Sequence, residues 1–263
     1  MNKEEIINKL NEFNTSKFKF EPIEHKYTYG DDIEFISVTT VTELFKQPFD
    51  REGVSKYVSE RDGIEQEAVL EMWDAKNERS KVMGTYIHEY IENYYNGIYQ
   101  PLPTDLEYID RINKFNVIHS KKLHKLEPLM FEARIFDTED LIAGTIDALF
   151  LYKGKIVIVD WKTNTKIATD EERRGRYNNL IHEKFRDVYQ NEHNLYSIQL
   201  SIYRRILEKK GLEVSACYIV YLPPTEEGEG RIIKGKDYRD RLDVIFGDKT
   251  SFDLKNQMES LHS

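Results

Sequence analysis

Two aspartates and one lysine lie in the stretch L-I-A-G-T-I-D-A-L-F-L-Y-K-G-K-I-V-I-V-D-W-K-T, residues 141–163. Runs rich in apolar and β-branched residues flank Lys153-Gly154, and a glycine in a two-residue connection is typical of a β-hairpin. If these two residues form the turn, counting back along both strands places Asp147 directly opposite Asp160. Side chains alternate between the faces of a strand, so Lys162 shares the face of Asp160. The pattern predicts two carboxylates and an ammonium at one end of a hairpin.

The opposed carboxylates indicate a metal site. Directly opposed Cβ atoms lie about 4.5–5.5 Å apart, and like charges there are destabilising unless they are neutralised. A divalent cation would neutralise them, and carboxylate oxygens are the ligands that Mg²⁺ prefers. The alternative is an edge hairpin in which Asp160 and Lys162 form a surface ion pair. The unbroken apolar run from Ile156 to Val159 is typical of a central strand that is buried on both faces, which favours the metal site.

Two further motifs flank the hairpin. M-G-T-Y-I-H-E-Y-I-E contains His88 and, one helical turn later, Glu92, while Q-L-S-I-Y contains Gln199 and Tyr203 on one stripe of a helix. A lone histidine on a mixed helix is usually a packing or surface residue. However, these motifs together with G-T-I-D and V-D-W-K-T, in this order, resemble the RecB-like branch of the PD-(D/E)XK nuclease superfamily. The similarity is to the phage and mitochondrial-type exonucleases.

The resemblance implies a role for each motif residue. Mg²⁺ is the expected cofactor, and Mn²⁺ should be able to replace it. The expected catalytic residues are Asp147, Asp160 and Lys162, and the expected metal ligands are His88, Asp147, Asp160 and the backbone carbonyl of Trp161. Glu132, on a strand expected at 129–136, is a further candidate ligand, or else pairs with Arg134 or a lysine. Gln199 and Tyr203 are expected to hold Lys162 or the DNA backbone.

The resemblance covers roughly residues 20–222 and implies an α/β fold with a restriction-endonuclease-like core. A central mixed β-sheet should be flanked by helices, with a helical N-terminal elaboration. Within this elaboration the pattern predicts a helix over 1–14 and then short strands over 18–35, with a turn at Gly30-Asp31-Asp32. We expect a single nuclease domain over residues 1–263. Its parts are the elaboration at 1–82, which includes a helix over 54–80 that continues into the His88 region, the catalytic core at 83–222 and a peripheral C-terminal segment at 223–263.

Two segments are candidates for contacting DNA. In I-S-V-T-T-V-T-E-L-F, hydroxyl groups either cap a helix or, with nearby N–H groups, hold a phosphate; they belong to Ser37, Thr39 and Thr40. Residues 164–189 form a long polar segment without clear periodicity, and loops of this length are usually functional or disordered. We expect a flap that faces the substrate, with a passage lined by Arg173, Arg174 and Arg176.

Composition limits the class of protein. The 263 residues are 40% hydrophobic and 32% charged, which is typical of a soluble globular protein, and the cytoplasm (of the host, if the protein is phage-encoded) is the expected location. No apolar run is long enough to cross a membrane, so we expect no membrane partner. The single cysteine, Cys217, excludes a cysteine-ligated iron–sulfur cluster, which some relatives in this branch carry. The net charge of −9 argues against a protein that coats nucleic acid nonspecifically.

The expected activity is metal-dependent hydrolysis of DNA by an exonuclease that starts from single-stranded ends. One alternative is an endonuclease of the same fold that acts on branched or duplex DNA. Another is a nucleic-acid-binding module without catalysis, which is disfavoured because every motif residue is present. Replication or recombination proteins are the partners that such a nuclease would be expected to have.

Overall fold

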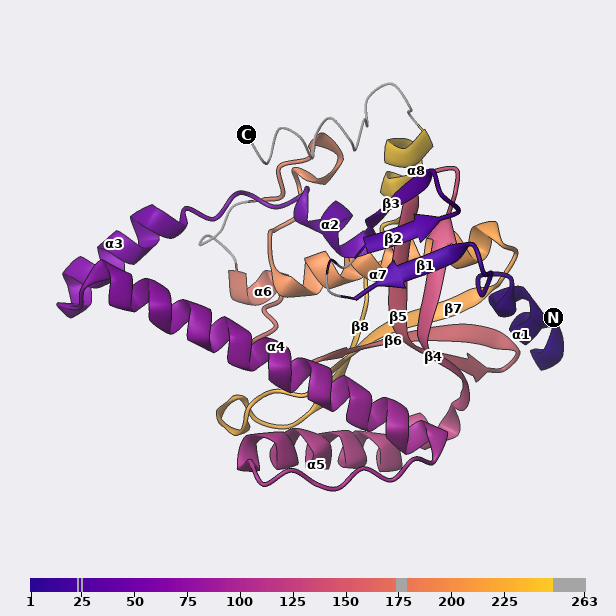
Figure 1. Ribbon diagram of the computed structural model, residues 1–263, viewed down its shortest axis with the longest axis horizontal. Helices are drawn as coiled ribbons and strands as arrows, with labels where there is room; N and C mark the ends of the chain where they lie inside the picture. Colours follow the sequence, from indigo (N-terminus) through magenta and orange to yellow (C-terminus); the bar gives the residue numbers. More distant parts are fainter. Residues whose placement is uncertain (23, 25, 174–178, 248–263) are drawn as a thin grey trace.

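Within the described residues, eight strands form one mixed sheet with helices on both faces (Figure 1). The computed structural model describes residues 1–22, 24, 26–173 and 179–247. The order is β1-β2-β3-β5-β6-β7-β8, with β4 also paired to β5; β3 with β5 and β6 with β7 are parallel, and the other pairs are antiparallel. The predicted α/β fold with a mixed sheet is confirmed. The strands are β1 (Phe18–Glu21), β2 (Lys26–Tyr29), β3 (Ile33–Ser37), β4 (Glu127–Asp137), β5 (Ile142–Tyr152), β6 (Lys155–Lys162), β7 (Val214–Tyr221) and β8 (Arg231–Lys234).

Two apolar layers cover the two faces of the sheet. On one face α7 and α2 pack against the strands, with Ile198, Ile202 and Ile206 of α7 buried. On the other face α4 and α5 cover the sheet, through Ile87 of α4 and Phe115 of α5 among others. The helices are α1 (Lys3–Asn11), α2 (Val38–Glu43), α3 (Arg51–Asp62), α4 (Gln66–Asn96), α5 (Leu106–Lys121), α6 (Asp170–Arg173), α7 (Glu192–Lys209) and α8 (Arg239–Gly247), with single 3₁₀ turns at Leu123–Lys125, Glu183–Phe185 and Thr225–Glu227.

The central hairpin forms where the sequence predicts it. Lys153 and Gly154 are the turn, and both have positive φ, +50° and +76°, as a type I′ turn requires. From this turn the two strands pair in the predicted register as far as Ala148 opposite Val159. The β6 strand is buried from Ile156 to Trp161 and has β5 and β7 as neighbours. It is therefore a central strand and not the edge strand of the alternative interpretation.

The N-terminal region agrees with the prediction in one respect and differs in another. The short strands expected over 18–35 are present as β1, β2 and β3, which form a meander that joins the main sheet through the parallel pairing of β3 with β5. The helix expected over 54–80 is interrupted at Gly63, which ends α3 in the left-handed conformation with φ +69°. A new helix, α4, then runs unbroken for 31 residues, from Gln66 to Asn96. The expected boundary between residues 82 and 83 therefore falls inside one helix.

The described parts of the expected flap, residues 164–173 and 179–189, are anchored to the core. Ile167, Leu180 and Phe185 are among their buried apolar side chains and belong to the core between the sheet and α7. The backbone N–H of Ala168 donates to the Glu192 carboxylate at the start of α7, at 3.0 Å. The sequence has no clear periodicity here because these anchors are isolated apolar residues, each with a distant partner. Of the described helices, none is both long enough and apolar enough to cross a membrane.

Candidate metal centre

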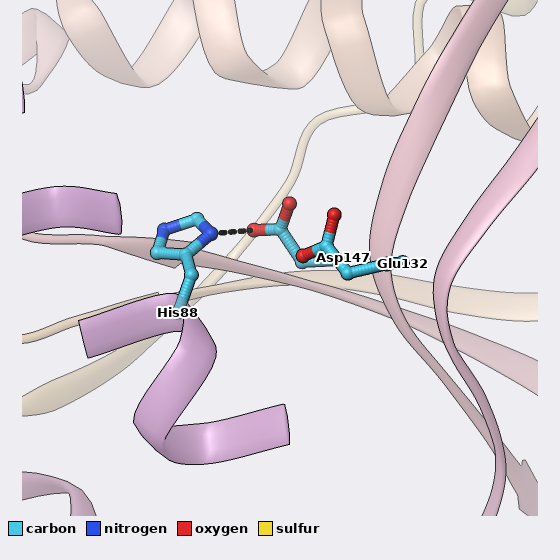
Figure 2. Close-up of side chains that lie close together, drawn as sticks. All are labelled: His88, Glu132 and Asp147. Atoms are coloured by element: carbon cyan, nitrogen blue, oxygen red, sulfur yellow. Dashed lines mark ion pairs between the residues drawn. The ribbon is translucent and has the colours of Figure 1, made fainter. Parts of the chain in front are cut away.

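Three side chains from three elements meet beside the sheet. His88 comes from α4, Glu132 from β4 and Asp147 from β5, and one potential ligand atom of each lies within 4.8 Å of the others. Figure 2 shows the His88 imidazole pointing toward the Asp147 carboxylate, with the Glu132 carboxylate beside it. His88 and Asp147 are half-buried, while Glu132 is exposed. Among the described residues, no other group of histidine, cysteine or acidic side chains comes together in this way.

The Asp147 side chain accepts a hydrogen bond from the backbone of β6 at the point where the pairing of β5 with β6 ends. The regular pairing of β5 with β6 ends just before Asp147, so the predicted direct opposition of Asp147 and Asp160 is not formed. Instead, Oδ2 of Asp147 accepts a hydrogen bond from the backbone N–H of Trp161 at 2.8 Å. The carboxylate thus satisfies a donor that the sheet leaves free, and this bond fixes its position relative to β6.

The hydrogen bonds of His88 define its tautomer. Its Nε2 lies 3.1 Å from the backbone carbonyl oxygen of Trp161. Because a carbonyl oxygen only accepts, Nε2 carries a proton, and Nδ1 faces Oδ2 of Asp147 at 3.6 Å. The Trp161 carbonyl therefore lies at the site but faces the imidazole, and its role as a metal ligand stays a prediction.

Lys162 and Asp160 form a buried ion pair. The Lys162 ammonium lies 2.9 Å from Oδ1 and 2.7 Å from Oδ2 of Asp160, and the two side chains are 17% and 4% exposed. Burial lowers the pKa of Lys162, but the negative charges of Asp160 and Asp147 outweigh burial and the net shift is upward. Burial raises the pKa of Asp160 despite the opposing effect of Lys162. Because the ammonium lies close to both oxygens, these contacts favour an ionised carboxylate paired with a protonated amine.

Glu132 occupies a strained backbone position. Its φ is +46°, in the left-handed region that non-glycine residues rarely adopt, and it lies in the middle of β4. The adjacent pairs of β4 with β5 are formed, but the pair of Glu132 with Asp147 is not. Such strain persists where the surrounding structure enforces it and is common at functional sites. Both carboxylates therefore lie at an interruption of the sheet.

The environment of Glu132 makes metal-free stability depend on pH. Desolvation by the surrounding protein raises the pKa of the Glu132 carboxyl to about 8, and repulsion from Asp147 and Glu92 raises it further. The folded-state pKa lies above the unfolded value, so the folded protein binds the proton more tightly, and metal-free protein should lose stability as the pH rises from about 4.5 to about 8. Exposure of the side chain moderates the effect. Urea unfolding in EDTA at several pH values should show a smaller decline for Glu132→Gln; an equal decline would contradict the assignment to Glu132.

The glycine and tyrosine of two motifs pack against each other. A Cβ atom on Gly144, in G-T-I-D, would lie 2.8 Å from Cε1 of Tyr203 and 3.1 Å from Cγ2 of Val38. Position 144 therefore requires glycine, because Tyr203 and Val38 leave no room for a side chain. Tyr203 is 3% exposed, and its hydroxyl accepts a hydrogen bond from Gln199 at 3.1 Å. The Tyr203 ring is buried between α7 and β5, which leaves it little surface for DNA, whereas Gln199 is half-buried. The expected role of both residues in holding Lys162 or the DNA backbone stays a prediction.

The other candidates for DNA contact differ in how exposed they are and in whether the structure describes them. Ser37 is buried and caps α2, where its hydroxyl accepts from the Thr40 N–H at 3.0 Å and lies 2.8 Å from the Thr40 hydroxyl. Capping therefore accounts for Ser37 and Thr40, and Thr39 is exposed. Arg173 ends α6. Arg174 and Arg176 lie outside the described residues, as does the side chain of Arg173.

Two residues near the site were not among the predicted site residues. Glu92 repels the Glu132 carboxylate, and its spacing of four residues from His88 on one helix was the available signal. The Tyr196 ring lies 4.6 Å from the Lys162 ammonium. It precedes Gln199 by one helical turn, so helical spacing alone could have placed it on the same side of α7.

The donor set fits a hard divalent cation. Two oxygens or nitrogens bound to the same Mg²⁺ at about 2.1 Å lie roughly 3.0 Å apart when adjacent in an octahedron. The 3.6 Å separation of His88 Nδ1 from Asp147 Oδ2 is slightly wider than this. In addition, Oδ2 of Asp160 is buried and, within the described residues, receives no hydrogen bond apart from its ion-pair contact. The oxygen lone pairs that do not face the Lys162 ammonium lie close to several negative charges, and a cation would satisfy them.

Comparisons with known proteins leave the family open. No family model matches the chain, and no curated protein matches it. One similar solved structure is described as "Crystal structure of SSO0001", with a TM-score of 0.35 and 15% sequence identity over 94% of this chain and 86% of that chain. A TM-score of this size does not define a shared fold. The functional argument therefore depends on the residues of the site.

Proposed function

We propose that this protein is a divalent-metal-dependent deoxyribonuclease with a PD-(D/E)XK-type site in a restriction-endonuclease-like core. One observation carries the proposal: His88, Glu132 and Asp147 converge beside the buried pair of Asp160 and Lys162. Acidic and imidazole ligands next to a fixed ammonium suit a reaction in which negative charge develops on a phosphate. The motif order in the sequence agrees with this chemistry.

The residues of the site have separate roles in this proposal. When bound, a divalent cation would neutralise charge on the scissile phosphate and make water more acidic. His88, Glu132 and Asp147 would hold it, with Asp160 and the Trp161 carbonyl as further ligands. The hydrogen bond from the Trp161 N–H orients the Asp147 carboxylate.

Lys162 would act on the reacting groups directly. Its backbone carbonyl accepts from the Leu222 N–H at 2.8 Å, and the residue pairs with Tyr221 of β7, so its main chain is fixed on a central strand. Its raised pKa keeps the side chain protonated at neutral pH. A fixed, protonated amine can donate hydrogen bonds to the phosphate oxygens as their charge grows, or can position the attacking water.

Metal removal tests the proposal. The protein is expected to cleave DNA with Mg²⁺, at least as well with Mn²⁺, and not after exhaustive treatment with EDTA, because the site offers oxygen ligands and one imidazole. Ca²⁺, which is larger and less demanding in geometry, should bind without supporting turnover. Nuclease rates with each ion added back to the EDTA-treated protein are the measurement. Cleavage that persists in EDTA would contradict the proposal.

We further propose single-stranded ends as the substrate, because two flanks of the site are linked to each other. Next to the site, Gly84 of α4 approaches Thr163, whose hydroxyl would lie 3.4 Å from a Cβ atom on that glycine. Farther away, Gln47 donates to the Gln190 side chain through its backbone N–H and to the carbonyl of Asn179 through its side chain.

These contacts close a circuit of chain. The circuit follows the backbone from Thr163 to Ala168, whose N–H donates to Glu192, two residues after Gln190. Gln190 accepts from the Gln47 N–H, and from Gln47 the backbone continues along α3 and α4 to Gly84, which approaches Thr163. Figure 1 shows α3 and the first part of α4 projecting from the body of the molecule as the outer part of this circuit. A DNA strand that passed inside the circuit could enter only by an end.

Closed DNA circles test the requirement for ends. Linear single-stranded DNA is expected to be degraded, and covalently closed single-stranded circles of the same sequence are expected to be spared, because a circle has no end to thread. Replacing Arg173, Arg174 and Arg176 together with alanine should weaken DNA binding and reduce its salt dependence. Equal cleavage of circles and linear strands would favour the endonuclease alternative. DNA binding without cleavage under any metal condition would favour the non-catalytic binding module.

A further inference from the structure

The Lys162 ammonium lies between a carboxylate and an aromatic ring. On one side Asp160 Oδ2 is 2.7 Å away, and on the other the centroid of the Tyr196 ring is 4.6 Å away. A cation within about 6 Å of an aromatic centroid, over its face, is attracted by the ring. With 17% of its surface exposed, the lysine side chain keeps a limited opening to solvent.

The ring is mounted on a rigid support. Tyr196 lies in the second turn of α7, next to the buried Ser197 and Ile198, and is packed against the main core cluster. The helix begins at a side-chain cap, in which Asn191 accepts from the backbone N–H of Asn194 at 2.9 Å. The ring position is therefore set by the core and does not depend on Lys162.

Asp160 alone is an insufficient anchor for a catalytic ammonium. If Asp160 shares its charge with a bound cation, as the proposed function requires, its attraction for Lys162 weakens and the cation repels the ammonium. An aromatic ring attracts the ammonium without offering a ligand to the metal. The opening left to the ammonium is then the direction from which the substrate phosphate approaches.

We propose that Tyr196 is a positioning residue that holds the Lys162 ammonium in place through the face of its ring. This inference rests on the proposed nuclease function. If the ring face holds the ammonium, Tyr196→Phe and Tyr196→Leu should differ in activity, because phenylalanine preserves the ring and leucine preserves only apolar bulk. A purely structural role would not predict this difference.

Steady-state kinetics on linear single-stranded DNA with Mg²⁺ test this role. Tyr196→Leu should lower kcat roughly 2- to 30-fold with little change in KM, while Tyr196→Phe stays within about twofold of the natural protein. The matched control is Tyr152→Leu, which removes an exposed tyrosine that contacts the Lys153 ammonium at 5.3 Å at the hairpin turn and should leave kcat unchanged. An unchanged kcat in Tyr196→Leu, or equal losses in Tyr196→Phe and Tyr196→Leu, would overturn the proposal.

A double-mutant cycle separates this inference from the proposed function. Urea unfolding of metal-free protein with Tyr196→Leu, Lys162→Met and both changes should show that the unfolding equilibrium constants are coupled by roughly 2- to 30-fold. Independent effects would show that the ring does not hold the ammonium, whether or not the protein is a nuclease. Coupling in a protein that cleaves no DNA with any metal would support the contact and contradict the proposed function.

Discussion

Replacing Lys162 with methionine is expected to slow DNA cleavage by about 10²- to 10³-fold, the usual effect of removing one donor that stabilises a developing negative charge. Methionine fills a similar volume, so the loss should come from the missing ammonium. DNA binding should change little, because one buried lysine contributes little to the contact with the phosphate backbone. Single-turnover rates at saturating protein, compared with binding measured in Ca²⁺, separate the two effects.

Lys166→Met is the matched control for this prediction. Lys166 is four residues further along, is 55% exposed and, within the described part of the chain, has a long contact, 3.8 Å, with Glu172 as its one ion pair. Its replacement removes the same charge from the protein and should leave the cleavage rate within about twofold of the natural protein. If both variants lost activity equally, the effect would be one of net charge, and Lys162 would have no special role.

The two aspartates should respond in opposite ways when each is changed to asparagine without metal. Asp160→Asn leaves the Lys162 ammonium buried without its partner, and breaking a buried ion pair typically costs about 3–5 kcal/mol. Asp147→Asn should leave the free energy of unfolding unchanged or raise it, because it removes repulsion while the amide oxygen can still accept from the Trp161 N–H. Both variants should lose nuclease activity.

Urea unfolding in EDTA at neutral pH is the measurement for this pair. The two substitutions are chemically identical and lie on neighbouring strands, so each is the control for the other. A large loss of stability in Asp147→Asn would assign that carboxylate a structural role. A negligible loss in Asp160→Asn would show that Lys162 is adequately held by Tyr196 and the surrounding carboxylates.

The sequence alone was sufficient for the features that depend on local periodicity. The turn at Lys153-Gly154 and the register up to Ala148 follow from the glycine and from strand alternation. The same alternation explains why Asp160 and Lys162 share a face. It could not show that the pairing stops before Asp147, because the side chain of that residue competes for a backbone N–H on the neighbouring strand.

Contacts between distant residues account for what the sequence did not show. The glycine of one motif is required by the tyrosine of another, across 59 positions from Gly144 to Tyr203, and no local pattern records such a contact. The burial of Ile167 and Leu180 likewise depends on partners elsewhere in the core. The positive φ of Glu132 has no local cause in the sequence, since glutamate has no preference for that conformation.

The parallel pairing of β3 with β5 has a consequence for how the protein is made. Ile36 pairs with Ile142, so two residues 106 positions apart must meet before the N-terminal meander can join the sheet. Contacts this remote are slow to form because closing the intervening loop costs entropy before any pairing offsets it. During synthesis the first three strands leave the ribosome long before their partner, and their exposed edge has to wait for it. A chaperone that covers this meander should therefore raise the yield of folded protein more than one that acts on the later strands.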